Sequence, residues 1–270
     1  MQNILLLFKR TINAVLPNQL LKLFWNLKYS SSNLGKEREY ILRIFCSKLL
    51  LNNENNKFLM EKAKKEKIRF SAQCAQDIIA YLFFKGKNRG FYIEIGANDG
   101  YTGSTTFWAE QLGWNGICVE PERKIFKELK MNRLCNLYNF AISDENRNGV
   151  EFINFPKRTS RSGISETMSK KQIDEARSYS YMSTITVDTL TFNDMMKDFP
   201  DIRHVDFLSI DTEGHEMNVI QSIDFDKYSF GLISIETGES SDVSKFVEKQ
   251  GYKILMIAGS DVIFIKEVVS

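Results

Sequence analysis

Several features that define other classes of protein are missing from this 270-residue sequence. It has only four cysteines, far apart and without a C-x-x-C pair, which argues against a disulfide framework or a zinc site and is typical of a reducing compartment. The formal net charge is +2, and neither a dense basic stripe nor an N/D-P-P-Y-type motif occurs, so the sequence does not predict nucleic-acid binding. We therefore expect a cytoplasmic protein whose partner is not a nucleic acid.

The amino-terminal segment lacks the features of a signal peptide and of a membrane span. Its first apolar run covers only residues 4–8 and is followed by Lys9 and Arg10, the reverse of the order in a signal peptide. Crossing a bilayer takes about twenty apolar residues. Apolar residues at helical spacing among basic ones leave two alternatives. One is an interfacial helix that makes peripheral membrane contact, and the other is packing on the main domain or on a second subunit of a homo-oligomer.

The pattern of the chain changes near residue 70. Residues 1–69 have helical periodicity and no strand-like run, which predicts a helical extension split by the polar residues 52–56. Residues 70–270 alternate strand-like with helical segments, which predicts one α/β domain whose mostly parallel sheet is covered by helices on both faces. The expected strands are 90–96, 116–121, 137–143, 149–155 (an accessory strand), 205–211, 230–236, 251–258 and 261–267.

The last two expected strands are joined only by Gly259 and Ser260, a connection that allows an antiparallel hairpin alone. Five parallel strands, a helix and a terminal hairpin predict the seven-stranded sheet of a Rossmann-like class I methyltransferase. Residues 156–184 are polar, serine-rich and basic without a strand pattern, and we expect a mobile substrate loop there. Its basic residues fit either an anionic acceptor or plain solvation.

A carboxylate and two glycines stand at the end of the first expected strand, in FYIEIGANDG (91–100). Ligands bind beyond the carboxyl ends of the strands in a doubly wound sheet, and Gly96 and Gly100 would let the backbone approach a ligand. The stretch lacks the G-x-G-x-x-G pattern of dinucleotide sites, and Asn98 would crowd a diphosphate. Glu120 ends the next strand 20 residues after Gly100, where a carboxylate binds a ribose diol. A ribose and an amino group without phosphate fit Glu94 and Glu120, which predicts S-adenosylmethionine.

An acidic block, DTEGHE (211–216), follows a second apolar strand. So many ionisable groups at a buried strand end predict acid–base chemistry or a divalent ion, with Asp211, Glu213 and His215 as candidate bases. Glu236 ends the neighbouring strand, so Asp211 and Glu236 predict a site for magnesium or a similar hard cation. The alternative is that the glutamates only charge the start of the next helix.

Several ordered blocks resemble the FkbM-type S-adenosylmethionine-dependent methyltransferases. They are FYIEIGANDGYTGSTTFWAEQLGWNGICVEP, NFAISD, ITVDTLTFND and VDFLSIDTEGHEMNVIQ. FSAQCAQDIIAYLF resembles the segment that precedes the glycine motif in that family. The resemblance covers residues 70–266 and leaves residues 1–69 outside.

The resemblance implies a Rossmann-like methyltransferase fold and methyl transfer to oxygen, commonly a hydroxyl of a sugar or a natural product. It implies that Glu120 binds the ribose and that Ser143 or Asp144 lies near the adenine. Related sugar O-methyltransferases that use a metal imply metal ligands at Asp211 and Glu236. The positions that correspond to cofactor-binding ones are Glu94, Gly96, Ala97, Asn98, Gly100, Glu120, Ser143, Asp144 and Asp211.

The expected reaction is an in-line displacement in which an acceptor hydroxyl attacks the sulfonium methyl. Asp211 or Glu213, with or without a metal, would take up its proton. We expect the acceptor to be a sugar in a glycan, glycolipid or sugar nucleotide, with a natural product as the alternative. Two other classes stay open: a nicotinamide-dependent enzyme, disfavoured by the missing phosphate cradle, and a non-catalytic binding or scaffold module on the same fold.

Overall fold

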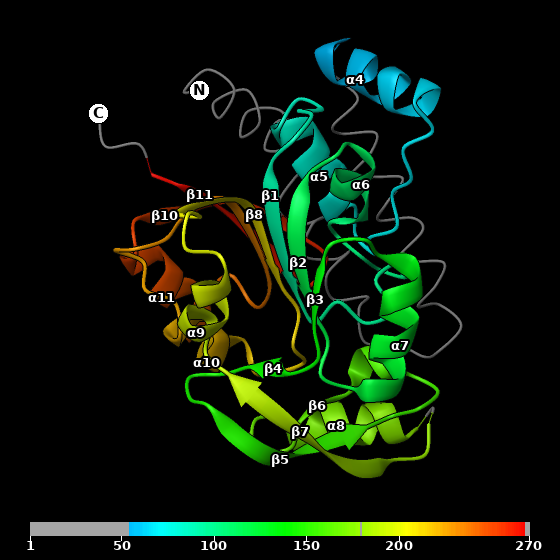
Figure 1. The fold of residues 1–270 in the computed structure, drawn as a ribbon, viewed down its shortest axis with the longest axis vertical. Coiled ribbons are helices and arrows are strands. Elements are labelled where there is room, and N and C mark those ends of the chain that lie inside the picture. Colours follow the sequence, from blue (N-terminus) through cyan, green and yellow to red (C-terminus); the bar gives the residue numbers. More distant parts are fainter. Residues whose placement is uncertain (1–53, 179, 268–270) are drawn as a thin grey trace.

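The computed structural model describes residues 54–178 and 180–267, so the predictions for residues 1–53 lie outside the described residues. A seven-stranded sheet stands between two layers of helices, and a second, smaller sheet lies beyond one end of it (Figure 1). This arrangement confirms the predicted α/β class I methyltransferase fold.

The large sheet has the strand order β10-β11-β9-β8-β1-β2-β3. Its five central and right-hand strands, from β9 to β3, are parallel, and β11 pairs antiparallel with both β9 and β10, as the short turn between β10 and β11 requires. The strands are β1 (Phe91–Ile95), β2 (Asn115–Val119), β3 (Asn136–Tyr138), β8 (His204–Ile210), β9 (Ser229–Glu236), β10 (Tyr252–Ala258) and β11 (Asp261–Lys266).

Both faces of the large sheet are buried, which explains why its strands are almost continuously apolar. In β1, Tyr92 packs toward one layer of helices and Ile93 toward the other. Figure 1 shows α5, α6 and α7 on one side of the sheet and α9, α10 and α11 on the other. The helices are α4 (Glu54–Lys65), α5 (Gln76–Phe83), α6 (Phe107–Gln111), α7 (Arg123–Asn132), α8 (Lys170–Arg177), α9 (Phe192–Met195), α10 (Glu216–Gln221) and α11 (Asp242–Lys249), with 3₁₀ turns η2 (Thr159–Arg161) and η3 (Met196–Asp198).

The small sheet has the order β4-β7-β5-β6 and lies beyond the carboxyl ends of the parallel strands (Figure 1). Because β4 follows β3 after only two residues, the chain passes directly from one sheet to the other at that end. The strands are β4 (Ala141–Ile142), β5 (Arg147–Asn154), β6 (Gly163–Ile164) and β7 (Ser183–Leu190).

Three expectations about elements were wrong. Residues 137–143 are not one strand, since they divide between β3 in the large sheet and β4 in the small one. Asn139 lies between the two and donates from Nδ2 to the carbonyls of Glu120 and Pro121, which fixes the change of direction. Residues 156–184 contain η2, β6 and α8 rather than a loop without secondary structure. Asn55 and Asn56 lie inside α4 rather than in a break between helices.

The described part of the predicted amino-terminal extension packs on the domain. Ala63 of α4 is 1% exposed, and Leu59 and Met60 contact the core cluster on the α5 face of the sheet. Tyr81 of α5 donates its hydroxyl hydrogen to the carbonyl of Leu59 at 3.0 Å. Within residues 54–178 and 180–267, no helix is both long and apolar enough to span a membrane.

Candidate functional site

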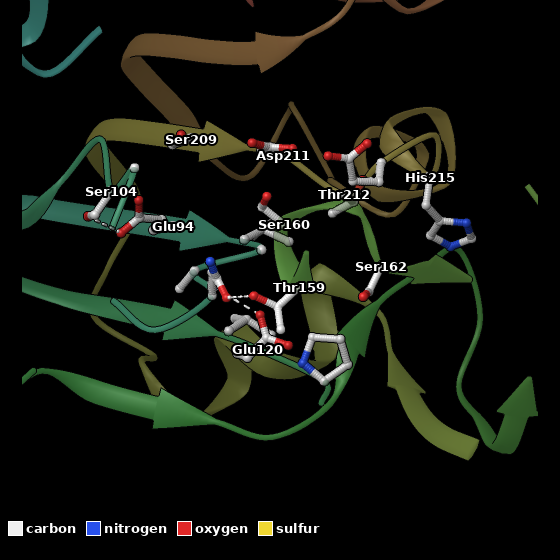
Figure 2. Close-up of a pocket in the computed structure, with 18 of the residues that line it drawn as sticks. Glu94, Ser104, Glu120, Thr159, Ser160, Ser162, Ser209, Asp211, Thr212 and His215 are labelled. Atoms are coloured by element: carbon white, nitrogen blue, oxygen red, sulfur yellow. Dashed lines mark hydrogen bonds between the residues drawn. The ribbon is translucent and has the colours of Figure 1, made fainter. Parts of the chain in front are cut away.

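A cavity lies between the carboxyl ends of β1, β2 and β8 and the small sheet (Figure 2). One wall comes from the turns that follow these parallel strands. The opposite wall comes from η2 and from side chains of the small sheet, such as Phe152 and Ile164. Eight of the predicted site residues line it: Glu94, Gly96, Ala97, Asn98, Glu120, Asp211, Glu213 and His215.

Gly96 lets β1 and β8 approach each other at the cavity floor. Its φ is +83°, and a Cβ atom there would lie 1.8 Å from the carbonyl oxygen of Asp211. The amide of Asp211 donates to the carbonyl of Ile95 at 3.0 Å, so the parallel ladder continues up to the edge of the cavity. Gly96 is therefore needed for the close approach of two backbones, whatever ligand lies above it.

Asn98 connects the turn after β1 to the end of β2 and to the opposite wall. Its φ is +48°, a left-handed conformation that asparagine tolerates better than most residues. Its amide donates to Glu120 Oε2 at 3.0 Å, and its side-chain oxygen accepts from the Thr159 hydroxyl at 2.9 Å. Glu120 Oε1 accepts from the amide of Glu122 at 2.8 Å. Burial raises the pKa of Glu120 to about 7.

Glu94 already has a cationic partner within the chain. Its Oε2 atom lies 3.1 Å from Nη1 of Arg133 and accepts hydrogen bonds from the hydroxyls of Ser104 and Thr106. Its Oε1 atom accepts from the amide of Thr105 at 2.8 Å. The carboxylate that sequence reasoning assigned to the cofactor's amino group thus also orders the turn that begins α6. Its role toward a cofactor stays a prediction.

Arg133 is the main residue of the site region that sequence reasoning missed. Its side chain is fully buried, with Nε 2.8 Å from Glu110 and Nη2 2.8 Å from the Tyr92 hydroxyl. Gly100 makes room for it, because a Cβ at Gly100 would lie 2.6 Å from Arg133 Cγ. Gly100 therefore serves packing against α7 and is not among the residues that line the cavity. No motif signals Arg133, since its partner Glu94 lies 39 residues away in the sequence.

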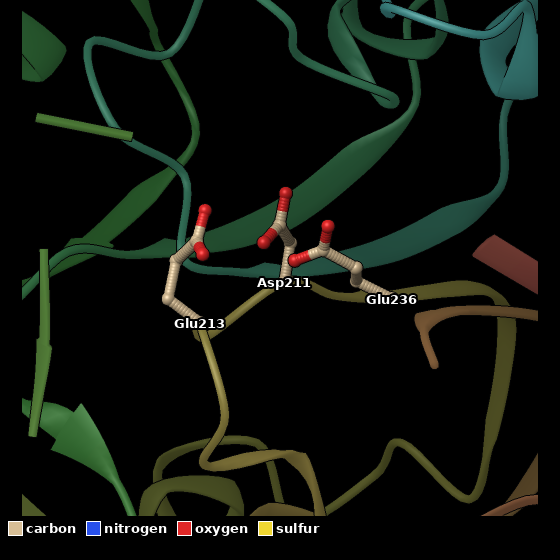
Figure 3. Close-up of side chains that lie close together, drawn as sticks. All are labelled: Asp211, Glu213 and Glu236. Carbon is tan, nitrogen blue, oxygen red and sulfur yellow. The ribbon is translucent and has the colours of Figure 1, made fainter. Parts of the chain in front are cut away.

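Three carboxyl groups lie close together beyond β8 and β9 (Figure 3). Asp211 and Glu236 were expected to lie near each other, and Glu213 is the third member. One oxygen from each lies within 4.8 Å of the others. Desolvation within the cavity, followed by the charges of Glu236 and Glu213, raises the pKa of Asp211 well above its usual range, although part of the residue is exposed to the open cavity. Burial and Glu236 raise the pKa of Glu213 to about 8, although Arg161 Nη1, 3.3 Å from its Oε2, opposes the shift.

Glu213 also has an unusual backbone conformation. Its φ is +55°, which a non-glycine residue adopts only where its surroundings hold it. The following Gly214 has φ +109° and lies against the carbonyl of Thr167. Glu216 is an acidic residue in the first turn of α10, as the alternative interpretation held, and its Oε1 accepts from the amides of Thr212 and Gly214 in the turn before the helix. Glu213 is instead directed into the cavity.

His215 lies in the cavity wall with both ring nitrogens engaged. Nδ1 is 3.0 Å from the Thr167 hydroxyl, and Nε2 is 3.0 Å from the Ser143 hydroxyl. Burial lowers the pKa of His215 to about 4, so its ring is neutral at physiological pH. Ser143 donates in turn to Asp144, and neither of these two is among the cavity-lining residues. His215 thus joins β4 to the turn after β6, and its role as a base stays a prediction.

The charge in the cavity is of one sign. Five carboxyl groups line it, whereas none of the described lining residues is lysine or arginine. They are Glu94, which is paired with Arg133, and Glu120, Asp211, Glu213 and Asp261. The pKa values of the last four are raised because desolvation is not offset by enough nearby cations. Such a cavity suits a ligand that carries a cation and lacks phosphate, which fits the sulfonium and ammonium groups of S-adenosylmethionine.

The model of the methyltransferase FkbM domain matches residues 94–254, more than half of the chain. The chain belongs to the FkbM methyltransferase family. It is an S-adenosylmethionine-dependent methyltransferase, as the sequence blocks predicted. No curated protein matches it.

Several solved structures have a similar fold, at low sequence identity. A methyltransferase from Geobacter sulfurreducens has a TM-score of 0.40 and 9% identity over 80% of this chain and 90% of that one. A putative caffeoyl-CoA O-methyltransferase from Staphylococcus aureus has a TM-score of 0.39 and 16% identity over 82% of this chain and 99% of that one. An O-methyltransferase from Bacillus cereus in complex with SAH has a TM-score of 0.35 and 11% identity over 79% of this chain and 91% of that one. These likenesses are too low to argue from.

Proposed function

We propose that this methyltransferase transfers its methyl group to a hydroxyl group of a sugar, in a glycan, a glycolipid or a sugar nucleotide. The observation that carries the proposal is Glu213, a carboxyl group that lines the cavity and whose pKa is raised to about 8. A neutral hydroxyl is a poor nucleophile, and a general base acts best when its pKa lies near the working pH. Glu213 fits that requirement.

Each part of the cavity has a role in this scheme. When bound, S-adenosylmethionine supplies an electrophilic methyl group on a sulfonium. Glu120 would accept hydrogen bonds from the ribose hydroxyls, and the turn at Gly96 would hold the methionine end. Glu213 takes the proton of the acceptor hydroxyl as the oxygen attacks, and Arg161 orients the Glu213 carboxylate. Holding the oxygen and the methyl group in line supplies much of the rate enhancement.

A magnesium ion is the second candidate for activating the hydroxyl. Asp211 and Glu236 would hold it, and the three carboxyl groups within 4.8 Å of one another are the type of ligand that magnesium prefers. Its chemistry there would be to polarise the acceptor oxygen. Under this alternative Glu213 completes the ligand set instead of acting as the base.

Mass spectrometry of glycans and glycolipids tests the proposal. The purified protein, S-adenosylmethionine and a cell extract should yield a sugar heavier by one CH₂ group. Glu213→Gln should bind S-adenosylhomocysteine in calorimetry but lose turnover, whereas the control Glu151→Gln, at an exposed site on β5, should retain both. Unchanged turnover in Glu213→Gln removes this residue from the mechanism. Methylation of a non-sugar product supports the natural-product alternative, and binding without any transfer supports a scaffold.

A further inference from the structure

The cavity spans five neighbouring strands of the large sheet. Its lining runs from Glu120 at the end of β2 to Asp261 at the start of β11. In the order β2, β1, β8, β9, β11, these two strands are four places apart. Neighbouring strands lie about 4.8 Å apart, so about 19 Å separates the two ends of the cavity.

A cofactor bound at one end leaves the other end free. With its ribose on Glu120 and its methionine end over the turn at Gly96, as in the proposed function, S-adenosylmethionine would lie across the ends of two adjacent strands, β2 and β1. Asp211 and Glu213 follow on the next strand, β8, at the middle of the cavity. Asp261 lies two strands beyond β8. The β11 end is therefore where the acceptor lies when its hydroxyl meets the methyl group near Glu213.

The two ends differ in chemistry. Next to Glu120 the lining is largely apolar and suits the adenine ring, with Phe140, Ile142, Phe152 and Ile164 as its main members. From β8 to β11 the lining has side chains that exchange hydrogen bonds with hydroxyl groups, and none of these described members is aromatic or basic: Ser209 on β8, Ser260 and Asp261 at the start of β11, and Gln73 and Gln76 from the segment that leads into α5. The lack of a cation at this end disfavours a phosphate or carboxylate on the part of the acceptor that it holds.

Asp261 is held ready to accept a hydrogen bond. It is 5% exposed, and its Oδ2 accepts from the Ser234 hydroxyl at 2.9 Å. The Gln76 amide donates to it as well, and the Ser260 hydroxyl lies at 3.4 Å, a long contact. A carboxylate offers about four acceptor positions, so Asp261 retains capacity for a ligand hydroxyl.

Ser209 is a second group without a use inside the protein. It is 3% exposed, lines the cavity and has no side-chain hydrogen-bond partner among residues 54–178 and 180–267. It sits on β8 between Glu94 of β1 and Ser234 of β9, and Figure 2 shows it on the same side of the cavity as Asp211. A hydroxyl that faces a polar cavity and has no partner within the described protein can contact a polar ligand.

We propose that Gln73, Ser209 and Asp261 form the acceptor subsite and that it binds a neutral, polyhydroxylated group such as an unphosphorylated sugar ring. This proposal rests on the proposed function and says where in the cavity its sugar acceptor binds. Asp261 accepts from one ring hydroxyl, Ser209 contacts a second group at the inner side, and Gln73 contacts the ring at the exposed rim.

Saturation-transfer NMR with the methyl glycosides of glucose, galactose, mannose and rhamnose tests the subsite on the full-length protein saturated with S-adenosylhomocysteine. At least one glycoside should give a signal in the wild type. The signal should fall at least about tenfold in Asp261→Asn and clearly in Gln73→Ala, in line with the loss of a hydrogen bond to a charged group. Glu120→Gln should weaken the binding of S-adenosylhomocysteine in calorimetry. Once the variant is saturated with S-adenosylhomocysteine, its glycoside signal should be intact.

Each contrary outcome overturns a definite part of the proposal. If Asp261→Asn weakens the binding of S-adenosylhomocysteine as much as Glu120→Gln does, the β11 end of the cavity binds the cofactor. If the glycoside signal survives in both Asp261→Asn and Gln73→Ala, the subsite is elsewhere, and if no glycoside binds the wild type, the ligand class is wrong. Gln73 is exposed, so its variant remains informative even where Asp261→Asn does not fold. Sugar methylation unaffected by these variants would overturn the subsite while leaving the proposed function standing.

Discussion

Replacing Arg133 by methionine should destabilise the domain strongly, because it leaves charges buried without a partner. The guanidinium is fully buried and forms ion pairs with Glu94 and Glu110. It also donates to the carbonyl of Gly100 and to the hydroxyls of Tyr92 and other neighbours. Methionine fills a similar volume, so the cavity it leaves is small and the electrostatic loss dominates.

The magnitude follows from the burial of the pair. Removing one partner of a buried ion pair costs about 3–5 kcal/mol, because the remaining charge has lost both water and its counter-ion. For a domain of this size, each kcal/mol lowers the melting temperature by about 2–4 °C. We therefore expect Arg133→Met to melt about 6–20 °C below the wild type. Arg133→Lys should fall between them, since an ammonium cannot form the same fork of hydrogen bonds.

Urea denaturation and calorimetry measure this effect. Lys127→Met is the matched control, because Lys127 is exposed on α7, the helix that ends just before Arg133, so the loss of stability should stay within about 0.5 kcal/mol. In the double variant Glu94→Gln with Arg133→Met, neither charge of the pair remains, and the cost should be less than the sum of the two single costs. An Arg133→Met variant within about 1 kcal/mol of the wild type would refute the argument.

Three further predictions concern the site itself. Gly96→Ala should unfold at a markedly lower urea concentration, since the new Cβ would lie 1.8 Å from the Asp211 carbonyl oxygen, and an unchanged midpoint contradicts this. Burial raises the pKa of Glu120 to about 7 and that of Asp261 to about 7, so the folded protein binds more protons than the unfolded chain, and the free energy of unfolding should fall as pH rises from about 5 to 8. A free energy of unfolding that rises over that pH range would contradict this prediction. Turnover should survive EDTA because Arg161 already supplies a cation to Glu213, whereas a loss that Mg²⁺ restores would make Asp211 and Glu236 metal ligands.

The sheet and the strand-end carboxylates were predictable from local sequence. A parallel strand buried on both faces is an apolar run, and the residue that ends it stands out when it is charged, as Glu120 and Asp211 do. The terminal hairpin was predictable because a connection of Gly259 and Ser260 permits no other geometry. In each case, a few neighbouring residues decide the structure.

Of the small sheet, β5 was predicted as the accessory strand 149–155, whereas β7 was missed although part of its signal was present. Residues 183–190 of β7 alternate in exposure over much of their length, the pattern of a half-buried antiparallel strand. Ser169 and Gln172 form a capping box at the start of α8, a pattern that local sequence can reveal. The polar and basic residues around these signals favoured the interpretation as a loop.

Contacts between distant segments carried no such signal. Arg133 meets Glu94 only because α7 packs beside β1, and Thr159 meets Asn98 only because the small sheet folds under the strand ends. Asp261 directly follows the Gly259–Ser260 turn and lines the cavity. The sequence of the turn predicts the hairpin but not that its next residue faces a cavity. These contacts form only in the assembled fold, so local sequence patterns do not predict them.

The strand order explains why the cavity extends from β2 to β11. The chain leaves β1 toward β2 and β3 on one side and later returns through β8, β9 and β11 on the other. The turns after β1 and β8 therefore diverge, which opens a crevice at the point where the order reverses. The small sheet closes this crevice from beyond the strand ends, and Thr159 fixes it to Asn98. The proposed reaction at Glu213, between a cofactor end at Glu120 and an acceptor end at Asp261, uses the order in which these carboxyl groups stand along the sheet.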